Sequence, residues 1–416
     1  MTRHIHVLTG AAAMAALGVL TACGGGSGTP PPPPPPPAHA VTITAGPGPS
    51  LTRPALNGAF VTVTVCVPNS SQCVTVPNVL LDTGSSGLRV LSSALGSLPL
   101  TNVTSPTDPN TTIAGCVQFV DLSYNWGPIA LADLKMAGEV ASSVPIQIIA
   151  SPAMAFPAAP STCSNGGTAG NSVDSLSANG IIGLSTYIYD CGSACAPGTS
   201  SNGGMYYACA NGTCQVTTLA LANQLQNPVA RFATDNNGIS ITLPSLPDNG
   251  LPSATGTLKF GIGTQSDNGL GSAVVQTLNR YGNFTTVFNG VSYSSSFIDS
   301  GTNGLFFLDS ATTGLPECTL SVGFYCPPTL QSLSATNVGT NSQSKVVGFS
   351  VINADNLPAA NYIFDDVAGT SSFGGSGTGL PTMYFDWGLP FFFGKTVFVA
   401  IEGKTTPGGT GPYWAY

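Results

Sequence analysis

The stretches VLLDTGSSGLRVL (residues 79–91) and SSFIDSGTNGLFFL (residues 295–308) are built to one plan. In each, an apolar run precedes Asp-[Thr/Ser]-Gly, a hydroxyl residue follows the Asp at the third position, and Gly-Leu resumes the apolar sequence. Asp and Gly suit turns, so each tripeptide predicts a tight turn at the end of a buried strand. If the two turns meet, the carboxyl groups of Asp82 and Asp299 lie together.

Two carboxyl groups a few Å apart have a defined chemistry. They cannot both ionise cheaply, so one keeps its proton and the other remains a base. Such a pair can activate a water molecule without a metal, a cofactor or a histidine. A single Asp-[Ser/Thr]-Gly in a chain with 51 Gly is most simply an ordinary turn, but two copies with matched flanks favour a shared site.

A second motif accompanies each Asp loop. Gly-Ile-Ile-Gly-Leu at 180–184 follows the first loop, and Phe-Asp-Trp-Gly-Leu at 385–389 follows the second. With these companions, the two loops resemble the active-site loops of pepsin-like aspartic peptidases. The chain is also similar to a family of bacterial lipoproteins that carry these motifs. The resemblance implies an all-β, bilobal acid-protease architecture with two duplicated β lobes and a central cleft.

The resemblance also implies roles for eight residues. Asp82 and Asp299 would hold the attacking water, one as general base and the other as acid toward the peptide carbonyl oxygen. The hydroxyls would cross-brace the loops or bond the outer carboxylate oxygens, and the glycines would permit close backbone approach. These supporting positions are Thr83, Gly84, Ser85, Ser300, Gly301 and Thr302. Turn capping alone is the alternative for each hydroxyl.

The resemblance is weakest at the flap, the hairpin that covers the cleft in that family. Residues 117–133 (VQFVDLSYNWGPIALAD) occupy its place, with Tyr124 as first and Trp126 as second candidate for the flap aromatic. Either aromatic could equally be core packing. Arg89 stands where the family has a Trp that supports the flap, and Gly87 replaces an Asn.

Charge and histidine content exclude several kinds of function. Ten Lys and Arg are scattered over 416 residues with a net charge of −8, which argues against nucleic-acid binding. His4, His6 and His39 all lie in the leader or tether, so a Ser-His-Asp triad or a His-ligated metal site is not expected in the folded part. We expect no metal and no cofactor.

The N-terminus resembles a lipoprotein leader. Residues 1–22 contain an apolar core too short to span a bilayer, and Leu20-Thr21-Ala22-Cys23 resembles the bacterial lipobox, in which the Cys is lipidated. An ordinary secretory signal cut near Ala22 is the alternative. Gly24 would favour the outer membrane in a two-membrane bacterium. Residues 23–54 are expected to be a tether, whose proline run (30–37) forms a stiff spacer of roughly 25 Å.

The remaining ten cysteines suit an exported, disulfide-bonded protein. We expect Cys66 to pair with Cys73, Cys116 with Cys163, and Cys318 with Cys326. The pairing among Cys191, Cys195, Cys209 and Cys214 is left open, and a metal knuckle is the alternative for these four.

Strand patterns dominate both expected lobes, which cover residues 55–245 and 246–416. Residues 60–65 alternate, and Asn289-Gly290 between two β-rich runs predicts a hairpin. Residues 217–225 are the best helix candidate, and the insertion at 187–214 could lie beside the cleft.

These features predict a surface-tethered aspartic endopeptidase of the bacterial cell envelope, anchored to the membrane through Cys23. It would act on a peptide or protein substrate at acid pH, as a monomer. The alternative is a catalytically inactive pepsin-fold lipoprotein that binds a peptide or protein ligand. A structural envelope protein is a third, weaker hypothesis.

Overall fold

The computed structural model describes residues 39–416 except 151, 153, 199–203 and 372–382. The predicted signal peptide, Cys23 and the proline run lie outside the described residues. Residues Pro36–Tyr416 form one compact unit. In the described part of the chain, no helix is long and apolar enough to cross a membrane.

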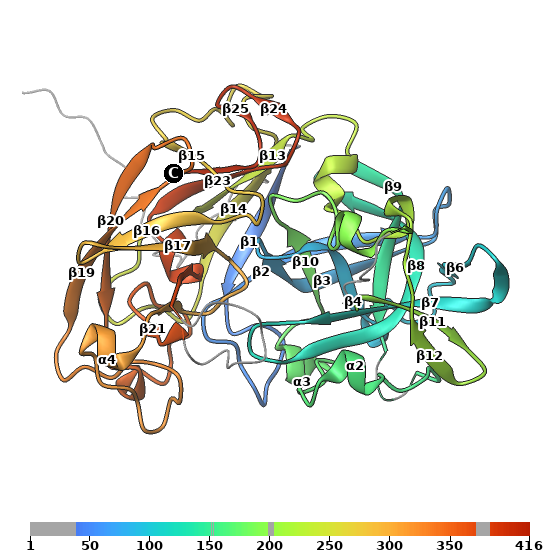
Figure 1. Ribbon diagram of the computed structural model, residues 1–416, viewed down its shortest axis with the longest axis horizontal. Coiled ribbons are helices and arrows are strands. Elements are labelled where there is room, and N and C mark those ends of the chain that lie inside the picture. Colours follow the sequence, from blue (N-terminus) through green and yellow to red (C-terminus); the bar gives the residue numbers. More distant parts are fainter. Residues whose placement is uncertain (1–38, 151, 153, 199–203, 372–382) are drawn as a thin grey trace, which may run out of the picture. The chain divides into compact units, whose positions relative to one another are not determined.

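Strands build the N-terminal lobe, shown in blue to green in Figure 1. The alternating stretch predicted as a strand lies in β2, where Val61, Val63 and Val65 are buried. The lobe's strands in chain order are β2 (Gly58–Cys66), β3 (Cys73–Asp82), β4 (Ser86–Leu91), β5 (Thr101–Asn102), β6 (Thr104–Ser105), β7 (Asp108–Gln118), β8 (Tyr124–Met136), β9 (Glu139–Ile149), β10 (Gly180–Leu184), β11 (Tyr206–Ala210) and β12 (Thr213–Val216).

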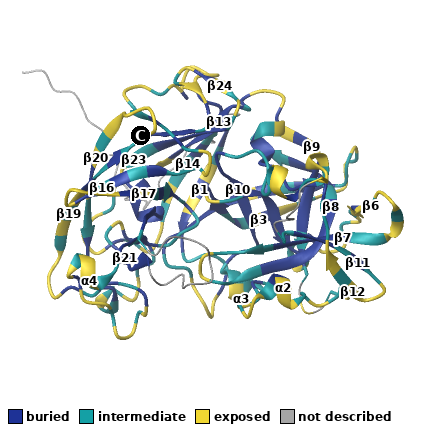
Figure 2. Ribbon diagram, in the orientation of Figure 1, coloured by how far each residue is buried: buried dark blue, intermediate teal, exposed yellow. Residues whose placement is uncertain are grey.

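A central sheet connects this lobe with the second one. Its strands pair in the order β2, β1, β14, β13, β23, β26, β15. Those not yet located are β1 (Ala40–Gly46), β13 (Gly238–Leu243), β14 (Ala254–Phe260), β15 (Val275–Thr277), β23 (Lys395–Ala400) and β26 (Tyr413–Ala415). Figure 2 shows much of β13 and β23 in the colour of buried residues.

Strand β1 corrects the tether boundary expected at residue 54. Ala40–Gly46 hydrogen-bonds between β14 and β2, so the folded region begins before residue 55. The imidazole Nε2 of His39 also lies 2.8 Å from Asp267 Oδ1, so the expectation that the folded part lacks histidine was wrong.

The C-terminal lobe contains the hairpin predicted at Asn289-Gly290, now confirmed as β16 and β17. Its core is aromatic, with Phe307, Phe385 and Trp387 stacked in series. The strands are β16 (Phe284–Phe288), β17 (Val291–Ile298), β18 (Leu305–Phe307), β19 (Gln331–Val338), β20 (Ser344–Val351), β21 (Ala368–Gly369) and β22 (Phe385–Trp387), with a separate pair β24 (Thr405–Thr406) and β25 (Gly409–Thr410).

Helices in the described residues are single turns. They are α1 (Ser92–Leu95), α2 (Ser161–Ser164), α3 (Val173–Leu176), α4 (Ser310–Thr313) and the 3₁₀ turns η1 (Gly192–Cys195), η2 (Leu221–Asn223), η3 (Pro228–Arg231), η4 (Ala354–Asn356) and η6 (Leu389–Phe392). The prediction of a helix at 217–225 was wrong, because within this segment only Leu221–Asn223 forms a helical turn, of the 3₁₀ type. The Gln224 amide instead donates to the carbonyls of Gly192 and Leu219, which holds this segment in an irregular path.

The three expected disulfides are confirmed, and the open pairing is resolved. Cys66–Cys73, Cys116–Cys163 and Cys318–Cys326 form as predicted. Cys191 bonds Cys195 and Cys209 bonds Cys214, so the metal-knuckle alternative is wrong for these four residues.

Candidate active site

Each Asp loop is held by a strand from its companion glycine motif. β10 runs parallel to β3, with Gly183 opposite Asp82, and antiparallel to β4. In the second lobe, β22 runs parallel to β17 and antiparallel to β18 in the same way. A Cβ on Gly183 would lie 2.6 Å from the backbone of Ser85, so only glycine fits under the loop. The predicted duplication of the lobes is therefore present in their hydrogen bonding.

Two buried hydroxyl residues connect the loops to each other. The Ser300 amide donates to Thr83 Oγ1 at 2.9 Å, and the Thr83 amide donates to Ser300 Oγ at 3.2 Å. The Ser300 hydroxyl donates onward to the Leu81 carbonyl at 2.7 Å. The exchange places the two Asp turns, which are 217 residues apart in sequence, in direct contact.

The carboxyl groups of Asp82 and Asp299 share a backbone donor. The Gly84 amide lies 2.8 Å from Asp82 Oδ1 and 3.1 Å from Asp299 Oδ1. The Gly301 amide donates to the same Asp299 oxygen at 2.8 Å. The Oδ1 atoms of Asp82 and Asp299, called the inner oxygens below, therefore both lie within hydrogen-bonding distance of one N–H group.

The outer oxygen of each carboxyl, Oδ2, accepts a hydrogen bond from the hydroxyl side chain three residues after the Asp. The Ser85 hydroxyl donates to Asp82 Oδ2. The Thr302 hydroxyl lies 3.1 Å from Asp299 Oδ2. The structure thus brings together the predicted aspartates and all six predicted supporting residues.

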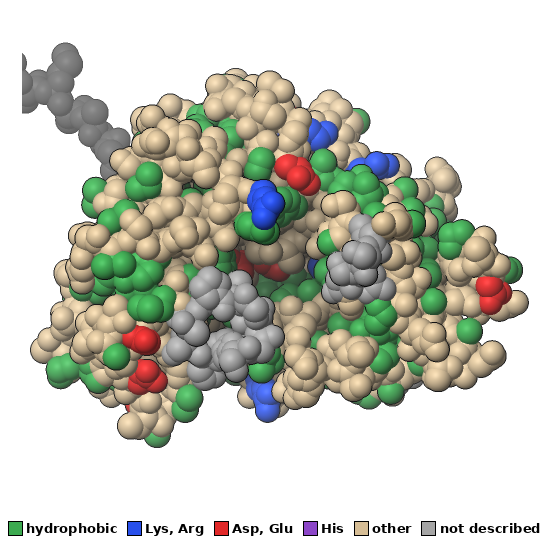
Figure 3. Space-filling model, in the orientation of Figure 1, with side chains coloured by type: hydrophobic (Ala, Val, Ile, Leu, Met, Phe, Trp, Pro, Cys, Tyr) green, Lys and Arg blue, Asp and Glu red, His purple; other side chains and the backbone are tan. Residues whose placement is uncertain are grey.

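The electrostatics of the pair favour a bound proton. Burial, then the charge of Asp82, then that of Asp386, raise the pKa of Asp299 well above its usual range, although Asp299 keeps some solvent exposure. Asp82 is 5% exposed. Figure 3 shows a hollow on this face of the molecule with acidic side chains at its floor.

A third carboxyl group was missed at the sequence level. Asp386, inside the second glycine motif, is buried, and its Oδ2 lies 3.0 Å from the Thr302 hydroxyl. Burial is the main cause that raises the pKa of Asp386 well above its usual range, and the charge of Asp82 adds to it. The only sequence signal was an Asp in an otherwise apolar motif.

The two flap candidates differ in their surroundings. Trp126 is buried, its indole N–H donates to the Pro157 carbonyl at 2.7 Å, and its ring packs edge-on against Tyr207. Tyr124 is half-buried beside the same cluster, at the start of β8. Among the described residues, neither side chain hydrogen-bonds Asp82 or Asp299.

Arg89, at the position of the expected Trp, lies in a buried polar network. Its guanidinium donates to the Ser86 carbonyl at 3.0 Å and lies 3.2 Å from Asp190 Oδ2. The Tyr206 hydroxyl donates to the other oxygen of Asp190 at 2.6 Å. Burial outweighs these partners and raises the pKa of Asp190 to about 6. Asp190 and Tyr206 both belong to the insertion at 187–214, so described residues of that insertion supply the carboxylate that pairs with Arg89 and the hydroxyl that bonds it.

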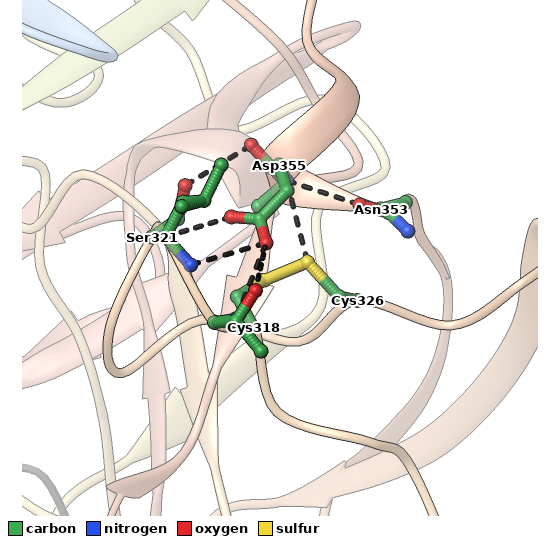
Figure 4. Close-up of a disulfide and its surroundings, with 8 residues drawn as sticks. Cys318, Ser321, Cys326, Asn353 and Asp355 are labelled. Carbon is green, nitrogen blue, oxygen red and sulfur yellow. Dashed lines mark hydrogen bonds between the residues drawn. A yellow bond between two sulfur atoms is a disulfide. The ribbon is translucent and has the colours of Figure 1, made fainter.

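The group formed by Cys318, Cys326 and Asp355 has the side chains of a metal site, but its bonding is different (Figure 4). The two sulfurs are joined in a disulfide, which removes the thiolates that a metal would need. The Asp355 carboxylate accepts backbone N–H bonds, including one of 2.7 Å from Ser321. These contacts close a loop of the C-terminal lobe.

Comparison with solved structures supports the fold. The chain is similar to the aspartic proteinase from Irpex lacteus, with a TM-score of 0.50 and 16% sequence identity, over 90% of this chain and 96% of that one. The predicted all-β, bilobal pepsin-like fold is therefore confirmed. No curated protein matches the sequence of this chain. A family model described as "Protein of unknown function (DUF3443)" matches residues 36–416, and the chain belongs to that family.

Proposed function

We propose that this protein is an aspartic endopeptidase in which Asp82 and Asp299 activate a water molecule to hydrolyse peptide bonds. One observation carries the proposal: the Gly84 amide reaches Oδ1 of both aspartates, at 2.8 and 3.1 Å. Two carboxyls joined in this way hold one proton between them at acid pH. The raised pKa of Asp299 supports the same arrangement.

The reaction follows from that single proton. Asp82, as general base, takes a proton from the water, whose oxygen attacks the peptide carbonyl carbon while Asp299 gives its proton to the carbonyl oxygen. Asp82 then passes its proton to the amide nitrogen, and the C–N bond breaks. A hydroxyl of the intermediate returns a proton to Asp299 as the carboxylic acid product forms.

The substrate and location are part of the proposal. An extended peptide or protein segment would enter the hollow shown in Figure 3. We assign the flap role to Tyr124 rather than Trp126, because the indole N–H of Trp126 is already bonded to the Pro157 carbonyl. We also propose that a lipid on Cys23 anchors the monomer to the bacterial envelope.

The proposal is tested with Pro36–Tyr416, the compact unit, and an unstructured protein as substrate over about pH 3 to pH 7. Asp82→Asn and Asp299→Asn are compared with Asp133→Asn, each with and without a statine-type inhibitor. Asp133 is a matched control because it is also buried and accepts backbone N–H bonds from Asn69 and Ser143.

Cleavage that disappears in both dyad variants, persists in the control and is blocked by the inhibitor is the expected result. A folded unit that cleaves nothing at any pH contradicts the peptidase. That outcome would favour the alternative, a pepsin-fold lipoprotein that binds a peptide or protein ligand.

A further inference from the structure

Asp386 forms a third acidic group beside the two carboxyls of the proposed dyad. It lies in β22, opposite Phe297 of β17 and Phe306 of β18. It is 5% exposed. Among the described residues, its hydrogen-bonding partner is the Thr302 hydroxyl, which also contacts Asp299. Asp299 and Asp386 are thus linked through one threonine, and Asp82 lies beside Asp299 at the shared Gly84 amide.

The Thr302 hydroxyl has a single proton, and this limits how the carboxyls of Asp299 and Asp386 can be protonated. Thr302 Oγ1 lies 3.1 Å from Asp299 Oδ2 and 3.0 Å from Asp386 Oδ2. A hydroxyl carries one proton and donates one hydrogen bond. Both contacts are therefore hydrogen bonds only if one of the two carboxyls is protonated and donates to Thr302 Oγ1.

The surroundings of the two carboxyls decide which one holds that proton. Oδ1 of Asp299 accepts the amides of Gly84 and Gly301, which are donors to a negative charge. Oδ1 of Asp386 is buried and has no partner among the described residues. A buried neutral acid with an unpaired carbonyl oxygen costs much less free energy than a buried carboxylate without donors. The proton donated to Thr302 therefore belongs on Asp386, and it is a different proton from the one that Asp299 shares with Asp82.

The charges that face Asp386 favour the same assignment. Asp299 lies on the other side of Thr302, and the charge of Asp82 also acts on Asp386. Tyr384 directly precedes β22, the strand that carries Asp386. Burial raises the pKa of Tyr384 to about 12, so this phenol stays neutral. Among the described residues, no Lys, Arg or His forms an ion pair with Asp386.

We propose that Asp386 is a positioning residue that remains protonated in the working protein, donates its proton to Thr302 Oγ1, and so directs the Thr302 hydroxyl at Asp299 Oδ2. When Asp386 loses its proton at higher pH, its carboxylate competes for the Thr302 hydroxyl and adds a negative charge beside the dyad. Asp386 thereby sets the upper pH limit of the proposed peptidase. Only this last effect rests on the proposed function.

Two measurements on the purified full-length protein test the protonation without any substrate. The infrared spectrum at mildly acid pH should lose a protonated-carboxyl carbonyl band in Asp386→Asn. In Asp309→Asn it should lose a carboxylate band, because hydrogen bonds from Thr312 hold the pKa of Asp309 below its usual range. Loss of a carboxylate band in Asp386→Asn would overturn the proposal.

The second measurement is unfolding by urea as pH rises from about 4, the unfolded pKa of an Asp. Folded Asp386 keeps its proton where the unfolded chain has lost it, so its contribution to stability falls as pH rises. The folding equilibrium constant of the wild type relative to Asp386→Asn should therefore fall by up to tenfold per pH unit. A ratio that stays constant, or rises with pH, contradicts a protonated Asp386.

The positioning role is tested by the pH profile of peptide cleavage. Asp386→Asn can still donate to Thr302 through its amide and should keep the kcat of the wild type at acid pH while extending activity to higher pH. Asp386→Leu cannot donate and should lower kcat about tenfold with little change in KM. Wild-type profiles in both variants would overturn the role. If even the wild type cleaves nothing, the peptidase proposal fails, while the infrared and unfolding results still decide the protonation of Asp386.

Discussion

Gly84→Ala should disable the proposed dyad while leaving the protein folded. A Cβ at Gly84 would lie 2.5 Å from Asp299 Oδ2 and 2.7 Å from Asp299 Cγ, whereas ordinary contacts are 3.4–4 Å. The Asp299 carboxyl would have to move by about 1 Å, a displacement that costs on the order of 10²-fold in rate when the group is catalytic.

The effect on stability should be small by comparison. The contact is with the end of a side chain, and Gly84 does not have the positive φ that disfavours other residues. We expect a change within about 1 kcal/mol in the free energy of unfolding. The two quantities are measured as kcat on one peptide and as urea unfolding of the same preparation.

Gly348→Ala provides the matched control. Gly348 lies in β20, has no positive φ, and a Cβ there would meet no atom within 4 Å. This variant should keep both the kcat and the stability of the wild type. A folded Gly84→Ala variant with wild-type kcat would refute the proposed role of the Asp299 position.

Three further predictions concern stability. Ser300→Ala leaves the Thr83 amide and the Leu81 carbonyl without a buried partner, and should cost about 3 kcal/mol in urea unfolding; a loss below about 0.5 kcal/mol would contradict the cross-brace. Arg89→Met leaves Asp190 buried without its cation and should cost about 3 to 5 kcal/mol at neutral pH. The pKa of Asp190 in the folded protein is already raised to about 6, so this carboxyl becomes neutral as the pH falls toward 4 and the loss of stability should shrink. Urea unfolding at neutral pH and at about pH 4 tests this, and an equal loss at the two pH values contradicts it. Removal of Cys116–Cys163, which spans 47 residues, should cost about 4 kcal/mol by loop entropy, measured as the shift in unfolding free energy of the double Cys→Ala variant; no shift would show that the bond constrains little.

Local patterns made the framework of the fold predictable. The Asp turns, the glycine motifs and the Asn289-Gly290 hairpin each occupy a short stretch whose residue types suit one geometry. The short disulfide loops were predictable for the same reason. The predicted roles of the site residues remain predictions.

Features that depend on distant partners were not predictable. Strand β1 follows the proline run, and it is defined by its pairing with β14. In the sequence, the whole of the first lobe separates these two strands. The Asp386 contact depends on Thr302, 84 residues earlier, and the Arg89–Asp190 pair spans 101 residues. The segment 217–225 has helical spacing, but contacts with other segments override it.

The most direct test of the account is kcat/KM for one extended peptide at acid pH, measured for the wild type, Asp82→Asn, Asp299→Asn and Asp133→Asn. We predict a loss on the order of 10³-fold or more in each dyad variant and wild-type activity in Asp133→Asn. Cleavage that survives in either dyad variant would contradict a mechanism that depends on both carboxyls.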